Sequence, residues 1–405
     1  MDMKKKLEDA YAPDKKSRKS KILIGLSGGI DSYVTAYLLK IQKYDLTAVT
    51  IINHWDEVPA DSVDGVLSCH IGQSKIDEIK EFCHKLSIPV QFIKAGTEFK
   101  ESVIEPWMGD KILGRKIRPC WNCHELRMSL LHEKMVELGA DKMATGHYAK
   151  LFHNEGHGSV FVHTSNDDVH DQSSLLSRLK HDILNCLLLP LSDLTKKEVL
   201  KLGENFGLVS EARKIQIHQC LTDKEALLNI FEKRVPKKLL TEGEISGLDV
   251  TVSYGQHEGV HHFNIGESYE FRDNGKPVKG VVAGYNYNDK RVIVVENEHL
   301  LRNKVLLINC KFSEEVAWPE PLKGFVAFSH ENIADCWIHP KSLSSVYLEF
   351  TENQRVLNGE IVSVIKKKGK NSKVLLTGQI RLLPLEPKTA EGEESVPKVN
   401  HFLDF

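Results

Sequence analysis

Hydrophobic positions in the first half of the chain fall into two alternating patterns, short continuous runs and longer, helically spaced ones. Residues 21–25 (KILIG) form a continuous run, and residues 31–43 place apolar side chains at helical spacing. The order repeats, with strand-like runs at 46–52, 89–93 and 141–147 and helical patterns at 75–87, 129–139, 173–188 and 195–208. Strands that alternate with helices predict a parallel sheet wound on both faces, so the expected fold class is α/β.

The second half of the chain has a different pattern, in which strand-like pieces alternate with Gly, Asn and Asp turns. Residues 285–295 (YNYNDKRVIVV) indicate a hairpin, and residues 359–383 place two apolar runs on either side of a basic turn. A polar stretch at 152–172 predicts a loop or hairpin near the site. We therefore expect a charged leader (1–20), a parallel-sheet nucleotide-binding domain (21–213), a small central domain (214–298), a C-terminal β-barrel (299–387) and a flexible tail (388–405).

Composition narrows the possible partners and compartment. The chain has 405 residues with 54 Lys and Arg against 56 Asp and Glu, and 41% of its residues are hydrophobic. This balance excludes a strongly basic nucleic-acid coat and a disordered chain, so RNA binding would depend on local patches. The charged N-terminus lacks the apolar core of a signal peptide, and no later run approaches the ~18 apolar residues of a membrane helix. The sequence therefore predicts a cytoplasmic protein without a membrane partner.

The segment GLSGGIDS, at residues 25–32, joins the first predicted strand to the first predicted helix. Two adjacent glycines let backbone N–H groups turn toward one point, and the helix that follows adds its positive N-terminal end. This arrangement predicts a phosphate-binding loop. No Gly-Lys-Ser/Thr follows, so the loop is not a Walker motif; SGGxDS resembles the loop of enzymes that split ATP between its α- and β-phosphates. The alternative, a glycine turn that only packs a helix on a strand, leaves Asp31-Ser32 unexplained.

The eight cysteines raise a question of chemistry, since their irregular spacing does not indicate a disulfide framework. Cys120 and Cys123 form a CxxC, and Cys220 lies far along the chain. A CxxC is compatible with half a zinc site, a redox pair or part of an iron–sulfur site, and spacing alone does not choose among them. The other five cysteines lie mostly in helix- or strand-like runs, where we expect them to pack as small apolar residues.

Several motifs occur together in one order: SGGIDS, NHWDE, GRKIRPCWNC, GADKMATGHYAK, DQSSLL, LPLSDLTKKEVLKLGENFGL and VSYGQHEGVHHFNIGES. In this combination the chain resembles the tRNA 2-thiouridylases from about residue 20 to 385. The resemblance implies an enzyme that uses ATP and Mg²⁺ to adenylate the C2 carbonyl oxygen of the wobble uridine in certain tRNAs and replaces that oxygen with sulfur. Its partners would be tRNA and a sulfur-donor protein, either a persulfide carrier or a cysteine desulfurase.

The resemblance also assigns roles to individual residues. Cys123 would be the nucleophile and Cys220 would carry a persulfide. The ATP-binding positions would be Gly25, Leu26, Ser27, Gly28, Gly29, Ile30, Asp31, Ser32, Ile52 and Gly146. The RNA-binding positions would be Arg118, Pro119, His147, Asp171 and Gln172. Outside the ordered motifs, His147 would be interpreted as a core histidine and Gln172 as a helix cap.

The sequence departs from the family where sulfur is handled. The family has Asn-Pro-Asp before the catalytic cysteine, and this chain has Arg118-Pro119-Cys120, so a third thiol replaces an acid. Cys120, Cys123 and Cys220 would suffice to hold three irons of a [4Fe–4S] cluster and leave the fourth iron open for sulfide. We favour this cluster over the alternative, a persulfide route that needs only Cys123 and Cys220.

A second departure lies near the C-terminus. Residues 358–360 are Asn-Gly-Glu where the family has Pro-Gly-Gln, which would place an acid near RNA. The nearby lysines at 366–368 and 370 would either contact RNA or form a solvated hairpin tip, and the second is favoured. Two other function classes stay open: an ATP-pyrophosphatase ligase that transfers nitrogen to another carbonyl, and a non-catalytic RNA- or metal-binding paralogue.

Overall fold

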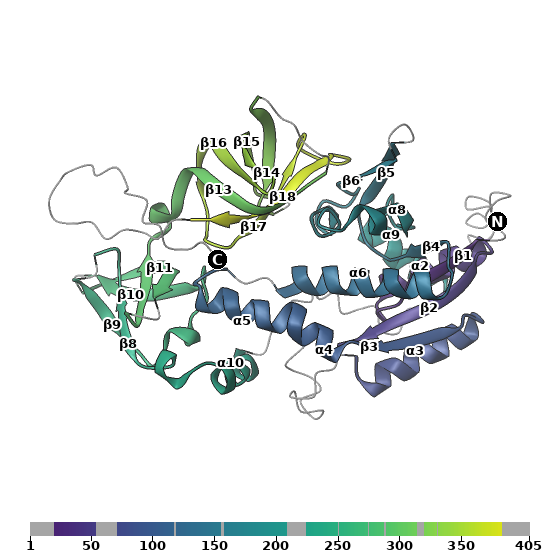
Figure 1. Ribbon diagram of the computed structural model, residues 1–405, viewed down its shortest axis with the longest axis horizontal. Coiled ribbons are helices and arrows are strands. Elements are labelled where there is room, and N and C mark those ends of the chain that lie inside the picture. Colours follow the sequence, from purple (N-terminus) through teal and green to yellow (C-terminus); the bar gives the residue numbers. More distant parts are fainter. Residues whose placement is uncertain are drawn as a thin grey trace.

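The computed structural model describes residues 20–53, 71–116, 119–154, 158–208, 224–249, 251–273, 275–286, 289–313, 320–329 and 331–382. Figure 1 shows a parallel sheet with its helices at one end of the molecule, a second sheet at the other end, and a barrel beside the long helix α6 (Pro119–Glu137). The α/β fold class with a C-terminal barrel is confirmed. In the described ranges, no helix is long and apolar enough to cross a membrane.

The parallel sheet carries the nucleotide-binding motif. In spatial order its strands are β3 (Val90–Lys94), β2 (Asp45–Ile52), β1 (Lys21–Gly25), β4 (Lys142–Ala144) and β7 (Leu187–Leu188). All neighbours pair in parallel, with β1 in the middle between β2 and β4. Because the chain moves from β1 outward to β3 and then returns to β4, the strand order reverses at β1. In such sheets the crevice at this reversal is the usual ligand site.

Alternating residues of β1 bind the two helical layers. Leu23 packs in one core with Met128 and Leu131 of α6. Ile22 and Ile24 point to the other face, where α2 (Ile30–Ile41) and α3 (Gln73–Lys85) cover them. Side chains in a strand alternate between faces, so a strand of five residues with an apolar centre requires helices on both sides.

The remaining helices of this part surround the sheet. They are α4 (Gly96–Phe99), the π-helical segment η2 (Lys100–Ile104), α5 (Glu105–Ile112), α7 (Ser173–Leu176), α8 (His181–Cys186) and α9 (Lys196–Asn205). Helix α9 begins with a capping box, in which Thr195 accepts from the Glu198 N–H and the Glu198 side chain accepts from the Thr195 N–H. The polar stretch at 152–172 includes most of the hairpin β5 (Lys150–Asn154) and β6 (Ser159–His163), as the sequence predicted.

The central part is a five-stranded sheet with short helices. Its spatial order is β10 (Ser268–Asp273), β11 (Lys276–Asn286), β12 (Arg291–Val295), β8 (Gly243–Ser246) and β9 (Ser253–His257). The helices are α10 (Lys224–Arg234), η3 (Lys237–Leu239), η4 (Val260–His262) and η5 (Asn297–Leu300). The predicted hairpin at 285–295 falls on the β11–β12 pair. Phe99, Ile104 and Trp107, from the segment before α6, pack into the core of this sheet.

The C-terminal part is a closed six-stranded barrel. Around the barrel the strands run β13 (Leu301–Phe312), β16 (Ser345–Arg355), β15 (Ile333–Ser342), β14 (Leu322–Ala327), β17 (Ile361–Ile365) and β18 (Val374–Arg381). Closure pairs β13 with both β16 and β18, so the antiparallel ladder has no exposed edge.

The barrel is fastened to the parallel-sheet part by the basic turn between β17 and β18. The Thr164 N–H, just after β6, donates to the Ser372 carbonyl at 2.9 Å, and the Ser372 N–H donates back to Thr164 Oγ1 at 2.8 Å. Lys373 lies over the Phe161 ring at 3.5 Å from its centroid. The turn therefore docks against the β5–β6 hairpin.

Candidate active site

The loop between β1 and α2 has the backbone of a phosphate cradle. Gly28 has φ +77°, and a Cβ there would lie 2.5 Å from Lys75 Cε. Gly29 begins α2 without a side-chain cap, and its carbonyl accepts from the N–H groups of Ser32 and Tyr33 at 3.1 Å each. The first-turn N–H groups of a helix lack partners within the helix and face its N-terminal end. The loop and helix end together suit an anionic ligand.

The other loop positions predicted from the sequence support this backbone. The Leu26 N–H donates to the Val49 carbonyl at 2.9 Å, which ties the loop to β2. Ser27 Oγ lies 3.4 Å from Ser32 Oγ, and Ser32 Oγ donates to the Gly29 carbonyl at 2.7 Å. These contacts keep the two serine hydroxyls at the mouth of the cradle.

Asp31, on the first turn of α2, is held by two side chains from elsewhere in the sequence. Lys196 Nζ lies 2.6 Å from both carboxylate oxygens, and the Tyr148 hydroxyl donates to Asp31 Oδ1 at 2.7 Å. Burial, followed by the Asp31 charge, raises the pKa of Tyr148 well above its ordinary value, so the phenol stays protonated. Sequence reasoning missed Lys196 as a site residue, although it lies in the LTKKEV motif.

Gly146 allows β4 and α2 to approach each other. A Cβ at Gly146 would lie 2.9 Å from the carbonyl carbon and oxygen of Asp31, which are backbone atoms that no rotamer change can move. The ATGH segment therefore lies directly against the first turn of α2. This contact brings Gly146 of the ATGH motif against Asp31 of the SGGIDS motif.

His147 forms a pair with His124 of α6. Their Nε2 atoms are 3.2 Å apart, and His147 Nδ1 lies 2.8 Å from Thr145 Oγ1. Burial, followed by the charge of Arg127, lowers the pKa of His147 to about 4, and burial lowers the pKa of His124 well below its ordinary value. Both rings are thus neutral near pH 7, and a single proton is shared in the contact between them. Sequence reasoning missed His124, since one His after a cysteine carries no signal by itself.

The CxxC lies in a helix. Where the family resemblance implied a catalytic cysteine in a loop, α6 begins at Pro119 and includes both Cys120 and Cys123 in its first two turns. Cys123 is buried and Cys120 is partly exposed. Residues three apart on a helix lie on the same side, so the two thiols share one face of α6. Cys220 and Arg118 lie outside the described residues.

Asn53, directly after β2, connects the sheet edge with Cys123. Its Nδ2 lies 3.5 Å from Cys123 Sγ, and the Asn53 side chain is fully buried with no hydrogen-bond partner at Oδ1. An N–H donor favours the thiolate over the thiol. The Asn53 amide was not predicted from the sequence, although a polar residue at the end of a buried strand is a usable signal.

Four other cysteines in the described ranges are structural. Burial raises the pKa of Cys83 to about 11 and those of Cys310 and Cys336 to about 12, and it also raises the pKa of Cys186. These thiols are poor nucleophiles at neutral pH. They pack as small apolar residues, as predicted; Cys69 lies outside the described residues.

The chain is similar to known proteins over most of its length. A family model described as the tRNA methyl transferase HUP domain matches residues 20–224. Similar proteins include the tRNA-specific 2-thiouridylases MnmA of Rhizobium johnstonii (30% identity over 92% of each chain) and of Oceanobacillus iheyensis (27% identity over 85% of this chain and 91% of that one). The chain belongs to the MnmA family of tRNA-specific 2-thiouridylases.

Two solved structures give more distant matches. The U34-tRNA thiolase NcsA from Methanococcus maripaludis, with its [4Fe-4S] cluster, is 23% identical over 57% of this chain and 73% of that one, with a TM-score of 0.34. The NH3-dependent NAD synthetase from Campylobacter jejuni is 17% identical over 58% of this chain and 86% of that one, also with a TM-score of 0.34.

The remaining family-implied positions have clear places in the structure. Ile52 ends β2 and is buried, and its carbonyl accepts from the Ala95 N–H. Asp171 accepts from the Ser165 N–H at 2.6 Å and from the Ser173 hydroxyl at 2.5 Å. Gln172 Oε1 accepts from the Tyr148 N–H at 3.1 Å, which fixes the segment after His147 instead of capping α7. Their roles toward ATP and RNA stay predictions.

Residues 358–360, which are Asn-Gly-Glu where the family has Pro-Gly-Gln, bind the segment of chain that leads into the CxxC. The Lys116 N–H donates to the Asn358 carbonyl at 2.7 Å, and Lys116 Nζ pairs with Glu360 Oε1 at 2.6 Å. Glu360 is buried, and its charge is balanced by this lysine. The sequence predicted that Glu360 would be an acid near RNA. In the structure its carboxylate instead forms an ion pair with Lys116 inside the protein.

A polar cavity of about 190 Å³ lies between this segment, α6 and the barrel. Its lining residues are Trp107, Asp110, Arg115, Lys116, Pro119, Asn122, Arg178, Asn309, Ile361 and Gln379. Pro119, predicted to contact RNA, thus faces this cavity.

Two lysines of the β17–β18 turn form ion pairs within the protein. Lys368 pairs with Asp335 at 2.5 Å, and Lys370 lies 3.9 Å from Asp168.

Proposed function

We propose that the protein is an ATP-dependent tRNA uridine 2-sulfurtransferase that acts on the C2 carbonyl of the wobble uridine. The observation that carries this proposal is one sheet edge where a phosphate cradle and a cysteine meet. Asp31 of the cradle touches Gly146, at the end of β4, and Asn53, at the end of β2, touches Cys123. A nucleotide-binding enzyme without sulfur chemistry would not need the contact between Asn53 and Cys123.

The residues of the cradle fit ATP and Mg²⁺. Gly28 turns the backbone with no Cβ in the way, and the start of α2 supplies amide donors. Asp31 would hold Mg²⁺ together with phosphate oxygens, since carboxylate and phosphate oxygens are its preferred ligands. Lys196, now paired with Asp31, supplies a cation beside the same carboxylate. Magnesium would neutralise the charge that develops on the departing pyrophosphate.

The reaction converts a poor electrophile into a reactive one. The uridine C2 oxygen bonds to the α-phosphorus while the bond to the β-phosphate oxygen breaks, and pyrophosphate leaves. Sulfur then bonds to C2, the C2–O bond breaks, and AMP departs. Because His124 and His147 are neutral at pH 7, the charges that would favour the anionic transition state come from lysines, namely Lys75 beside Gly28 and Lys196 beside Asp31.

Sulfur delivery is assigned to Cys123 with Cys220, with Cys120 as a third thiol. In the persulfide route Cys123 is the nucleophile, supported by the Asn53 N–H donor. Cys120 and Cys123 fit two ligand positions of a [4Fe–4S] cluster, because they share one helix face, and Cys220 would be the third ligand. Such a cluster would supply an open iron that carries sulfide; in its place, a persulfide on Cys220 would serve with a sulfur-donor protein as partner.

The proposed function is tested with purified protein, ATP, Mg²⁺, a sulfur source and a tRNA transcript that bears a wobble uridine. The sulfur source is sulfide for the cluster route, and a persulfide-loaded cysteine desulfurase with a dithiol reductant for the persulfide route. We expect pyrophosphate release and 2-thiouridine by nucleoside mass spectrometry. Cys123→Ser should keep pyrophosphate release and lose thiouridine, whereas Cys186→Ser, a buried structural cysteine, should keep both. Pyrophosphate release with no RNA substrate and full turnover in Cys123→Ser would instead indicate a ligase. Absence of any pyrophosphate release would indicate a non-catalytic paralogue.

Iron and sulfide counting after anaerobic purification tests the sulfur route. We expect iron bound to the wild type and lost from Cys120→Ser and Cys123→Ser. A colourless, iron-free protein that still forms thiouridine would eliminate the cluster and leave the persulfide route.

A further inference from the structure

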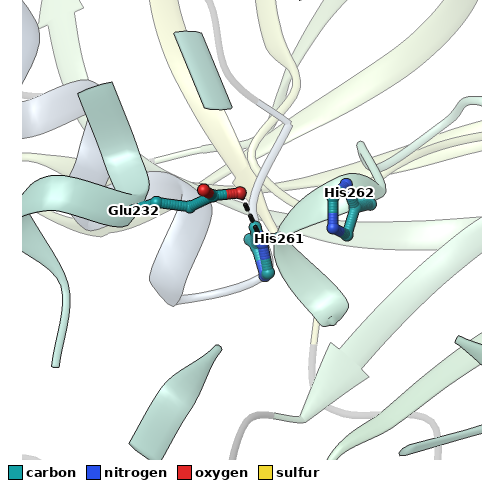
Figure 2. Close-up of side chains that lie close together, drawn as sticks. All are labelled: Glu232, His261 and His262. Atoms are coloured by element: carbon teal, nitrogen blue, oxygen red, sulfur yellow. Dashed lines mark hydrogen bonds and ion pairs between the residues drawn. The ribbon is translucent and has the colours of Figure 1, made fainter. Parts of the chain in front are cut away.

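A group of three metal-ligating side chains lies in the central part, on residues to which the proposed activity assigns no role. Glu232 lies on α10, and His261 and His262 lie on η4 (Figure 2). One donor atom from each side chain lies within 4.8 Å of the other two, and no other His, Cys, Asp or Glu trio in the described ranges satisfies this condition. The two histidine rings lie with their centroids 4.2 Å apart and are tilted by 38° to each other.

The spacing of the first two donors suits a small divalent cation. Glu232 Oε1 and His261 Nε2 are 3.1 Å apart. Two ligands at about 2.0–2.1 Å from a tetrahedral zinc ion are separated by about 3.3 Å. His262 would complete the set by a small side-chain rotation, because it is the neighbouring residue and is only partly buried.

His261 is held in place but incompletely satisfied. Its side chain is 3% exposed, and its Nδ1 is buried with no hydrogen-bond partner. The ring packs over Gly259, where a Cβ would lie 2.4 Å from that nitrogen, and it stacks on the buried Phe231 with an interplanar angle of 11°. Because Nδ1 packs against Gly259, the nitrogen that could bind a metal is Nε2, which faces Glu232.

Two charged side chains at the group affect cation binding in opposite directions: Lys111 opposes it and Glu232 favours it. Lys111 Nζ, which donates to the Phe263 carbonyl at 3.0 Å and to Asn264 Oδ1 at 3.1 Å, is the neighbouring cation. Burial, followed by the charge of His262, lowers the pKa of His261, and the Lys111 charge acts in the same direction. The Glu232 carboxylate offsets the repulsion between the lysine and a bound cation.

We propose that Glu232, His261 and His262 bind a divalent transition-metal ion of the zinc type. A two-histidine, one-carboxylate donor set is chemically suited to such ions. Since Glu232 belongs to a helix and both histidines to the sheet domain, the ion would cross-link α10 to η4. Helix α10 begins four residues after Cys220, so the cross-link would fix the chain just beyond the sulfur-carrying segment. This site does not depend on the proposed thiolation activity.

The test uses the full-length chain, freed of metal by a chelator and titrated with Co²⁺ and Zn²⁺ under anaerobic conditions. We expect one Co²⁺ equivalent with visible d–d bands and without the thiolate charge-transfer absorption that a cysteine site would give. Glu232→Gln and His262→Ala should each weaken this binding by at least about 100-fold, which is the upper range for losing even an outer partner. Zn²⁺ should raise the thermal unfolding midpoint of the wild type and of neither variant.

Two controls make the result decisive. His299→Ala removes a histidine that lies 3.9 Å from the carboxylate of Glu298 and belongs to no donor trio among the described residues. This variant should bind Co²⁺ as the wild type does. A Cys120→Ser, Cys123→Ser double variant should also keep the signal. If His262→Ala does not fold, Glu232→Gln decides alone, because its side chain is 41% exposed. Equal Co²⁺ binding by wild type and Glu232→Gln, or binding only with a thiolate signature, would overturn the proposal.

Discussion

Gly359 allows the barrel to contact the segment that leads into the CxxC, and substituting it should separate the two. Gly359 has φ +82°, and a Cβ there would lie 2.7 Å from both the Arg115 Cβ and the Lys116 nitrogen. Gly359→Ala therefore combines about 1 kcal/mol of left-handed backbone strain with the loss of two hydrogen bonds. These are the bonds from the Lys116 N–H to the Asn358 carbonyl and from Asn358 Nδ2 to the Gly114 carbonyl.

At about 1 kcal/mol for each hydrogen bond, the total loss is about 3 kcal/mol. Gly369→Ala is the matched control, because Gly369 has φ +93° in the same barrel and a Cβ there would meet no atom within 4 Å. It should lose only the strain, about 1 kcal/mol.

The assay combines urea unfolding with tRNA thiolation at saturating ATP. We expect Gly359→Ala to lose stability and at least tenfold in thiolation, because the segment that positions α6 is displaced. Gly369→Ala should retain thiolation. Equal stability losses and equal activities in the two variants would refute the idea that barrel docking positions the cysteine helix.

Other substitutions address the nucleotide cradle. Lys196→Met should lower the rate of pyrophosphate release at least tenfold, because the Asp31 carboxylate loses its ion pair. Lys197 is an exposed neighbour, so Lys197→Met should keep the wild-type rate. Equal rates in the two variants would show that Lys196 does not belong to the site. Gly146→Ala should abolish ATP binding in a filter or calorimetric assay, since its Cβ would strike the Asp31 backbone, and unchanged affinity would contradict the close contact. The folded pKa of His147, about 4, lies below its ordinary 6.5, so the unfolded chain binds more protons between these values and stability falls as the pH drops through this window. His147 should therefore contribute about 2 kcal/mol less at pH 5 than at pH 7.5, a slope that His147→Gln should reduce in urea titrations.

Local sequence patterns predicted the order of strands and helices in the parallel-sheet part, although two short helices and β7 occupy the predicted helix at 173–188, and α6 begins at 119 where the pattern predicted 129. The continuous run at 21–25 and the helical spacing after it define a strand and a helix, because each pattern buries a different kind of surface. Gly28 and Asp31 could be assigned to phosphate binding since a positive φ and a helix N-terminus are local properties. The hairpin at 285–295 and the barrel were predicted for the same reason.

The long-range partners of the site could not be predicted from the sequence alone. Lys196 meets Asp31 across 165 residues, and Asn53 meets Cys123 across 70. His124 gains its neutral state only from the burial and the partner that His147 provides. The interpretation of Glu360 changed for this reason too, since its effect depends on Lys116, which lies 244 residues away.

The sequence by itself determined where strands, helices and the phosphate loop occur, because spacing, glycine and capping act within a few residues. Only the tertiary structure decided which charges are paired and which nitrogens are left without partners. It also decided which of the described cysteines lies beside Asn53, at the end of β2. Charge, hydration and pKa depend on neighbours brought together by packing, and no local pattern specifies which neighbours those are.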